Sequence, residues 1–270
     1  MIIDLTGRVA IVTGSTAGIG LATAEGLARA GASVVVNGRG EDRVTAAVQR
    51  IRDTVPGSSI SGVAADMATA EGIATLVAHS PDADILVNNV GTAYLREYSG
   101  LADIAAIPDE DWLSLFQLNV MSGVRASRHY LPGMVARGWG RVVFVSSESG
   151  LNIPKEMLDY GMTKTAQLAV SRGLAEAVAE TGVTVNAVLP GPTRSEIMGN
   201  FSAGEAEREG ISQEEAERRF VRQMRPTSLL GRVATTDEVA NMIVYVCSEQ
   251  ASATNGAALR VDGGVVRGIA

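Results

Sequence analysis

A tyrosine and a lysine stand four residues apart in the second half of the chain, at Tyr160 and Lys164. In a helix this spacing places both side chains on one face, where their polar ends can converge. The pKa of a free tyrosine is about 10, and a nearby ammonium group together with an oxidised nicotinamide favours the phenolate. The pair therefore predicts a tyrosine acid/base. A chance pairing on a surface helix is the alternative.

Two further polar residues could complete a catalytic group. Ser147 follows the apolar run 142–145, so a strand there would bring its hydroxyl to the carboxyl edge of a sheet. A hydroxyl at that edge can orient a substrate carbonyl and stabilise the charge that develops on its oxygen. Asn119 lies in a long apolar helical segment, where an amide must find hydrogen-bond partners, either functional or structural. Glu148 could face the substrate or be a solvated loop charge.

A glycine-rich segment near the N-terminus could bind a pyrophosphate. Gly14, Gly18 and Gly20 lie between an apolar run at 8–12 and a helical run at 21–30. A glycine turn that opens a helix places backbone N–H groups and the positive end of the helix beside a bound phosphate. The spacing differs from the G-x-G-x-x-G dinucleotide fingerprint, so an ordinary strand-to-helix turn is the alternative.

The residues after the second expected strand bear on the choice of cofactor. Asn37-Gly38-Arg39 follows the β-branched run 34–36, at the place where the adenosine ribose of a dinucleotide would lie. A guanidinium there could pair with a ribose 2′-phosphate, whereas an acidic residue would bind a free 2′-hydroxyl. The sequence therefore favours NADP over NAD. Arg39 could also be a simple surface residue, since Glu41 and Asp42 partly offset its charge.

Strands and helices that could position these residues alternate along almost the whole chain. Strands are expected at 8–12, 34–36, 60–65, 85–88, 141–146, 183–189 and 258–261, and helices at 21–30, 42–54, 70–79, 109–137, 157–180 and 236–249. This alternation predicts parallel strands, because each helix must return the chain to the same edge of the sheet. The predicted fold is an α/β, Rossmann-type doubly wound sheet with helices on both faces, which binds ligands at the carboxyl ends of its strands.

The same alternation of strands and helices indicates how many domains the chain forms. No linker, low-complexity stretch or charge block divides residues 1–270, so the chain is predicted to form a single dinucleotide-binding and catalytic domain. Residues 195–230 interrupt the alternation of strands and helices, because they contain the charged helical stretch 205–225. We interpret residues 195–230 as a substrate lid, with a solvated pair of surface helices as the alternative.

The composition and net charge of the chain limit the kinds of partner that it can bind. The hydrophobic content of 46% suffices for a sizeable core, and the net charge of −7 would repel nucleic acid. The N-terminus lacks a secretory signal pattern and no apolar run has the length of a membrane helix, so a cytoplasmic protein without membrane contact is expected. His79 and His129 have no second ligand at metal-binding spacing, so no metal site is predicted.

These motifs together resemble those of the short-chain dehydrogenase/reductase family, in its single-domain branch. The resemblance covers almost the whole chain and rests on Thr13-Gly14-x-x-x-Gly18-Ile19-Gly20, Asn88-Asn89-Val90-Gly91, Asn119, Ser147, Tyr160-x-x-x-Lys164, Pro190-Gly191 and Val261-Asp262-Gly263-Gly264. It implies an NAD(P)-dependent oxidoreductase that moves a hydride between nicotinamide and a carbonyl or secondary-alcohol carbon. Tyr160 would be the acid/base, Ser147 would orient the substrate oxygen, and Lys164 would hold the nicotinamide ribose. Asn119 would support a water-linked proton path.

The resemblance also implies the residues that bind the cofactor. They are Gly14, Ser15, Thr16, Gly18, Ile19, Gly20, Arg39, Asp66, Met67, Asn89, Gly91, Tyr160, Lys164, Pro190, Gly191 and Thr193. Val90 stands where alanine is usual, and Thr16-Ala17 supplies no basic residue where many NADP-preferring members carry one. A homo-oligomer is implied too, usually a tetramer and otherwise a dimer, formed through the helices at 109–137 and 157–180.

Several alternatives stay open at this point. The substrate could be a 3-oxoacyl thioester on an acyl carrier protein, which a basic pocket mouth would favour; the candidates are Arg128, Arg137, Arg194 and Arg222. A non-catalytic module that senses dinucleotides would have lost catalytic side chains, and all four are present. Tyr94 and Tyr98 could line the pocket or serve packing alone.

Overall fold

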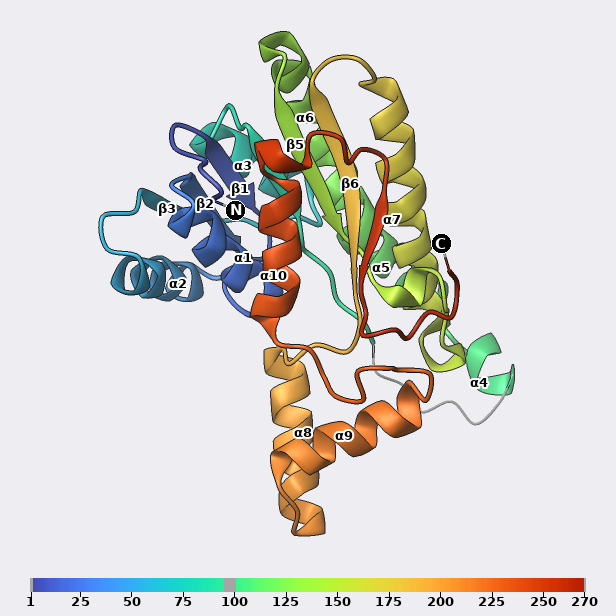
Figure 1. Cartoon of the computed structure of the whole chain (residues 1–270). Helices are drawn as coiled ribbons and strands as arrows, with labels where there is room; N and C mark the ends of the chain where they lie inside the picture. The colour runs from blue at the N-terminus through green and yellow to red at the C-terminus, as the bar shows by residue number, and fades with distance from the viewer. Residues whose placement is uncertain (1, 95–100, 270) are drawn as a thin grey trace.

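The computed structural model of the protein describes residues 2–94 and 101–269. Its strands form one parallel sheet in the order β3-β2-β1-β4-β5-β6-β7 (Figure 1). The strands are β1 (Val9–Val12), β2 (Ser33–Gly38), β3 (Ile60–Ala64), β4 (Ile85–Asn88), β5 (Gly140–Val145), β6 (Val183–Pro190) and β7 (Ala258–Val261). Strand order reverses between β1 and β4, and ligands of such sheets bind outside the carboxyl ends at this point.

Helices cover both faces of the sheet (Figure 1). The α-helices are α1 (Gly18–Arg29), α2 (Glu41–Thr54), α3 (Ala70–His79), α4 (Leu101–Ala105), α5 (Asp109–Phe116), α6 (Ser122–Arg137), α7 (Leu158–Ala177), α8 (Glu196–Glu209), α9 (Gln213–Met224) and α10 (Thr236–Val246). One core cluster joins the sheet to α1, α2 and α10, and a second joins it to α3, α6 and α7. The predicted doubly wound Rossmann-type fold is confirmed.

The central strands contribute to both cores because successive side chains of a strand point to opposite faces. In β1, Ala10 and Val12 belong to the cluster under α1 and α10, whereas Ile11 belongs to the cluster on the other face. All three are fully buried. A strand covered on both faces reads as a continuous apolar run, and this explains why the strands could be recognised without polar alternation.

The helix expected at 109–137 is not continuous. It consists of α5, a π-helical segment η1 (Gln117–Met121) and α6. A π-helical turn is commonly found at functional sites, and this one carries Asn119, whose side chain bonds to neighbouring segments. The short helix α4 was not predicted, and the helix expected at 157–180 begins at Leu158 and ends at Ala177.

The charged stretch expected at 205–225 belongs to two helices. Gly210, with φ of 64°, ends α8, and α9 begins at Gln213. The two helices pack together through Phe201 and Phe220, whose rings meet edge to face at 5.6 Å between centroids. Both project beyond the carboxyl end of the sheet (Figure 1). Residues 195–230 therefore lie at the sheet edge where ligands of this fold bind.

Candidate active site

The glycine-rich loop leaves the start of α1 open to an anion. Gly14 has φ of 62°, a backbone conformation that favours glycine. The N-cap residue, Ala17, makes no side-chain hydrogen bond, and the first turn of α1 contains no acidic residue. At Gly20 a Cβ atom would lie only 2.5 Å from the Gly14 carbonyl oxygen, so any larger residue would displace the loop. The uncapped helix end therefore fits a phosphate group.

Several polar side chains hold this loop in place rather than facing a ligand. Ser15 is fully buried, and its hydroxyl donates to the Val12 carbonyl oxygen at 2.6 Å while its N–H bonds to the Asn37 carbonyl oxygen. The Asn37 Oδ1 accepts the Gly14 N–H at 3.2 Å. Ser15 thus contributes to the expected cofactor site by shaping the loop. Ile19 is partly buried and packs against the core.

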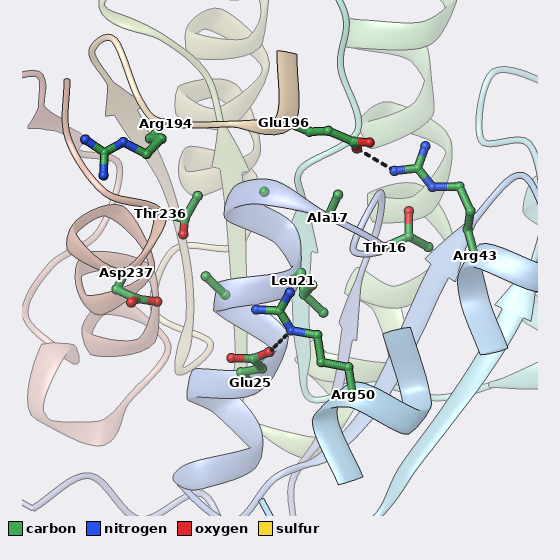
Figure 2. A pocket seen from close by; sticks show the side chains of 12 residues that line it. Thr16, Ala17, Leu21, Glu25, Arg43, Arg50, Arg194, Glu196, Thr236 and Asp237 are labelled. Carbon is green, nitrogen blue, oxygen red and sulfur yellow. Dashed lines mark hydrogen bonds and ion pairs between the residues drawn. The ribbon is translucent and has the colours of Figure 1, made fainter. Parts of the chain in front are cut away.

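A pocket of about 460 Å³ opens beside the loop (Figure 2). Thr16 lines it together with Arg43 of α2 and Glu196 of α8, and Arg43 and Glu196 form an ion pair of 2.7 Å. Arg39 follows β2 and is exposed. Arg43 was not predicted to lie here, although its position four residues after Arg39 at the start of α2 could have indicated it. Arg39 does not line this pocket, whose guanidinium groups belong to Arg43, Arg50 and Arg194.

Asp66 and Met67, two of the expected cofactor-binding residues, lie just after the end of β3. Asp66 is exposed, and its Oδ1 accepts the Ala68 N–H at 3.0 Å. Met67 is buried and packs in the core beneath this edge. Asn89 directly follows β4 and donates from Nδ2 to the carbonyl oxygens of Thr13 and Gly14, which ties the end of β4 to the glycine-rich loop.

Tyr160 and Ser147 come together at the carboxyl end of β5. Tyr160 lies in the first turn of α7, and Ser147 follows β5 directly. Desolvation raises the pKa of Tyr160 to about 12; a hydrogen bond with Ser147 lowers this pKa, while the charge of Glu148 raises it further. The expected lowering of the tyrosine pKa by Lys164 is not seen; the groups that lower this pKa are Ser147 and Arg225, and burial has the largest effect.

Lys164 lies one turn further along α7 and is buried. Its Nζ is 5.5 Å from the centroid of the Tyr160 ring and donates to the Val145 carbonyl oxygen at 2.9 Å and to Gln167 Oε1 at 3.1 Å. Desolvation lowers the pKa of Lys164 to about 7. Gly91 packs against this ammonium group, since a Cβ at Gly91 would lie 3.2 Å from Nζ. The backbone that follows β4 therefore passes close to the Lys164 ammonium group at Gly91.

Asn119 uses its side chain for structural contacts. Its Oδ1 accepts the Thr92 N–H at 2.9 Å, and its Nδ2 donates to the Thr92 carbonyl oxygen and to Thr163 Oγ1. The Asn119 carbonyl oxygen accepts Gln167 Nε2 at 2.6 Å. Gln167 therefore bridges Lys164 and the backbone of Asn119 through its side-chain amide. The sequence analysis did not single out Gln167, which is buried three residues after Lys164.

A buried ion pair stands next to Ser147. Glu148 and Arg225 form it at 2.5 Å, and their side chains are 3% and 10% exposed. Arg225 immediately follows α9, so the pair connects the segment 195–230 to the end of β5. The view of Glu148 as a solvated loop charge is wrong, because its carboxylate is enclosed by Arg225, Ser147 and Ser149.

Three more of the expected cofactor-binding residues, Pro190, Gly191 and Thr193, lie at or just after the end of β6, which pairs with β5. Pro190 ends β6, and the Gly191 N–H donates to the Val261 carbonyl oxygen of β7. Thr193 Oγ1 donates to the Gly191 carbonyl oxygen at 2.9 Å. Tyr94, expected near the pocket, bonds through its hydroxyl to Ser114. Tyr98 lies outside the described residues.

Within residues 2–94 and 101–269, no group of three or more histidine, cysteine or acidic side chains could hold a metal ion. In the same part of the chain, no helix has the length and apolar character needed to cross a membrane.

Known proteins share both the sequence and the architecture of this chain. A sequence profile described as short chain dehydrogenase matches residues 8–206. The uncharacterized oxidoreductase YvaG of Bacillus subtilis is 41% identical over 269 residues, covering 100% of both chains. The D-beta-hydroxybutyrate dehydrogenase of Cupriavidus necator is 35% identical over 266 residues, covering 97% of this chain and 99% of the relative. The crystal structure of L-sorbose reductase from Gluconobacter frateurii, complexed with NADPH and L-sorbose, superimposes with a TM-score of 0.90 at 32% identity, covering 100% of both chains.

Proposed function

Because the chain belongs to the short-chain dehydrogenase family and is an NAD(P)-dependent oxidoreductase, we propose that it transfers hydride between NADP and a carbonyl or secondary-alcohol carbon of a small molecule, with Tyr160 as acid/base. The observation that carries this proposal is the meeting of Tyr160, Lys164 and Ser147 at the carboxyl edge of β5. The nicotinamide supplies the hydride in reduction and receives it in oxidation.

The proposed roles follow from the contacts of each side chain. Tyr160 gives its phenol proton to the substrate oxygen in reduction and takes a proton in oxidation. Its raised pKa keeps this proton in place at neutral pH. Ser147 orients the substrate through its hydroxyl group, and Lys164 donates to the ribose from its buried ammonium group. Asn119 acts as a positioning residue, since its carbonyl oxygen holds Gln167 against Lys164.

We place the cofactor along the edge from β3 to β6. The uncapped start of α1 and the close approach at Gly20 fit the pyrophosphate of a dinucleotide there. The proposed cofactor-binding residues besides Tyr160 and Lys164 are Gly14, Ser15, Thr16, Gly18, Ile19, Gly20, Arg39, Asp66, Met67, Asn89, Gly91, Pro190, Gly191 and Thr193. Ser15, Ile19 and Met67 would contribute through the backbone, because their side chains pack in the loop or the core.

NADP is the proposed preferred dinucleotide. Arg39 is exposed after β2, and Arg43 reaches the adjoining pocket from α2. Arg43 is paired with Glu196, so the exposed Arg39 guanidinium is the group that suits a 2′-phosphate. The L-sorbose reductase with the same architecture was crystallised with NADPH, which supports this choice.

At the level of the whole chain, we propose one catalytic domain in which residues 195–230 act as a lid. The lid segment contacts the rest of the protein through ion pairs that include Arg43 with Glu196, Arg194 with Glu217 and Arg225 with Glu148. We further propose a cytoplasmic homo-oligomer, a tetramer or a dimer, that has neither nucleic acid nor membrane as a partner. The net charge of −7 supports the absence of a nucleic-acid partner.

A 3-oxoacyl-thioester reductase remains the less favoured alternative. Three of the four arginines considered for an acidic carrier protein are already paired with carboxylates. Arg137 pairs with Asp82, Arg194 with Glu217 and Arg222 with Glu215. The charge available to a carrier protein is reduced accordingly. A non-catalytic sensor is disfavoured because Tyr160 and Lys164 retain an arrangement suited to proton transfer.

The test combines binding with turnover. NADPH and NADH are titrated by fluorescence, and NADPH oxidation is then followed with L-sorbose, acetoacetate and acetoacetyl-CoA. We expect tighter binding of NADPH than of NADH and reduction of at least one ketone. The Tyr160→Phe variant should bind NADPH with nearly unchanged affinity while losing turnover by about a thousandfold or more, since it lacks only the acid/base hydroxyl. Near-normal turnover of this variant would remove Tyr160 from the mechanism.

A further inference from the structure

The hydrogen-bonding capacity of Ser147 is almost fully used by the protein. A serine hydroxyl has one hydrogen and two lone pairs. The hydrogen is donated to Glu148 Oε2 at 2.6 Å, and one lone pair accepts the Ser149 N–H at 3.1 Å. The single capacity that remains is a lone pair. Toward Tyr160 and the substrate, Ser147 is therefore an acceptor.

Glu148 holds the hydrogen of Ser147 firmly because the carboxylate is fixed and charged. Its Oε1 accepts Arg225 Nε, and its Oε2 also accepts the Ser149 hydroxyl at 2.7 Å. A hydrogen bond to a carboxylate is roughly twice as strong as one to a neutral acceptor such as a ketone. Ser147 could lower the pKa of Tyr160 only by turning this hydrogen to the phenolate, and Glu148 opposes that turn.

Tyr160 supplies the complementary group. In its neutral form the phenol donates a hydrogen bond, and its raised pKa keeps it neutral over the physiological range. The site thus presents a donor, Tyr160, beside an acceptor, Ser147. A plain ketone can use only the donor, because its oxygen would face the serine lone pair without a hydrogen between them. A ketone with a hydroxyl on the adjacent carbon can use both.

We propose that the substrate is an α-hydroxy ketone, interconverted with a vicinal diol, and that Glu148 is a positioning residue that selects it by fixing Ser147 as an acceptor. This proposal rests on the proposed function. In reduction the carbonyl carbon gains a hydride from NADPH, which is oxidised to NADP⁺. The carbonyl oxygen gains the phenol proton of Tyr160, and solvent replaces that proton. The neighbouring hydroxyl donates to Ser147 in both the ketone and the diol.

Glu148→Gln reverses the polarity of this contact with little change in shape. The Arg225 Nε–H needs an acceptor, so the amide oxygen takes the place of Oε1. The amide nitrogen then takes the place of Oε2 and has one hydrogen for Ser147 and one for Ser149. Ser147 accepts instead of donating at this contact, and its own hydrogen is released toward the substrate. This variant should tolerate a plain ketone.

The experiment compares matched ketones with NADPH as reductant. The probes are hydroxyacetone against acetone and 3-hydroxy-2-butanone against 2-butanone. The wild type is expected to prefer the hydroxy ketone in kcat/KM by about a hundredfold or more, since sites that bind a substrate hydroxyl reject analogues lacking it. In Glu148→Gln this preference should fall at least about tenfold. Intrinsic differences in ketone reactivity are common to both proteins and cancel in the comparison.

Two further variants make the result specific. Ser149→Ala removes another partner of Glu148 Oε2 but leaves the bond from Ser147, so it should retain the wild-type preference. Glu148→Asp keeps the charge and withdraws the carboxylate from Ser147 by one methylene, so its preference should fall as in Glu148→Gln. This second variant provides the test if Glu148→Gln does not fold, as judged by thermal unfolding.

The outcomes separate this inference from the proposed function. An unchanged preference in folded Glu148→Gln, or wild-type reduction of acetoacetate without any preference for the hydroxy ketones, would overturn the role of Glu148 and leave the oxidoreductase intact. If the wild type reduces none of the ketones tested, the proposed function is overturned, and the inference falls with it.

Discussion

Burial acts in opposite directions on the two titrating side chains of α7. It disfavours the charged form of each group, so the pKa of Tyr160 is raised to about 12 and that of Lys164 is lowered to about 7. At pH 7 Tyr160 is therefore neutral, whereas Lys164 is divided about equally between its ammonium and amine forms. A bound dinucleotide that accepts hydrogen bonds from Lys164 would favour its ammonium form. Cofactor binding and the protonation of Lys164 should be linked.

This linkage predicts a pH-dependent affinity for the cofactor. The pKa of Lys164 is about 7, so the ammonium group is present below this pH and is lost as the pH rises through it. Affinity for NADH should consequently be highest below pH 7 and weaken above it, by up to about tenfold per pH unit. NADH is the ligand to titrate, because the 2′-phosphate of NADPH itself titrates near pH 6. Fluorescence titration between pH 6 and 9 measures the effect.

Lys164→Met provides the control for this prediction. It keeps an apolar side chain of similar length in the buried position but has no ammonium group. Its affinity for NADH should be weaker at low pH and nearly independent of pH. If the wild type and Lys164→Met show the same pH dependence, Lys164 does not contact the cofactor as an ammonium group.

The parts of the site that could be predicted from the sequence depend only on residues that lie near one another along the chain. Tyr160 and Lys164 share a helical face, and Ser147 directly follows an apolar strand, so spacing alone brings them together. Arg225 and Arg43 were not placed in the site. Arg225 meets Glu148 across 77 residues, and Arg43 meets Glu196 across 153. Such contacts depend on how the lid segment packs, which spacing does not encode.

The elements that hold the site depend on close backbone contacts. In the loop between β1 and α1, a Cβ at Gly20 would lie 2.5 Å from both the Gly14 carbonyl oxygen and Asn89 Nδ2. The end of β4 and the start of α1 are therefore packed without space for a methyl group. The arrangement fixes the direction of the free N–H groups at the start of α1.

Gly20→Ala is expected to damage this arrangement. The added methyl must displace the loop, so the affinity for NADPH should fall by at least about tenfold and the thermal midpoint should fall with it. Gly173→Ala in α7 is the matched control, because a Cβ there meets nothing within 4 Å. That variant should bind NADPH normally and gain about 1 kcal/mol of helix stability. Unchanged NADPH binding by Gly20→Ala would show that the loop does not hold the phosphates.

The π-helical segment between α5 and α6 could not be predicted from the sequence pattern. Residues 109–137 have helical periodicity, and the segment 117–121 contains neither proline nor glycine to mark an interruption. The π-helical turn there coincides with the bonds of Asn119 to Thr92 and Thr163, which lie 27 and 44 residues away in sequence. Tertiary hydrogen bonds therefore accompany the interruption, and a pattern within one helix cannot reveal them.

At the scale of the whole molecule, the order of strands and helices was predictable because the strands are buried on both faces and read as apolar runs. The assembly of several chains is a separate matter. A net charge of −7 on each chain opposes association, so any stable contact must come from apolar surface. Leu113 of α5 is 63% exposed, and Val135 of α6 is also exposed. These helices belong to the region proposed to mediate self-association.

Leu113→Glu tests whether this surface joins the chains. Light scattering of the wild type should give a mass near four or two times that of one chain. The introduced charge would have to be buried in the contact, so the variant should shift to a smaller species while its far-UV spectrum stays unchanged. Ile2→Glu is the control, because Ile2 is 87% exposed and lies outside these helices. Equal masses for both variants and the wild type would place the contact elsewhere, and a wild-type monomer would refute the oligomer itself.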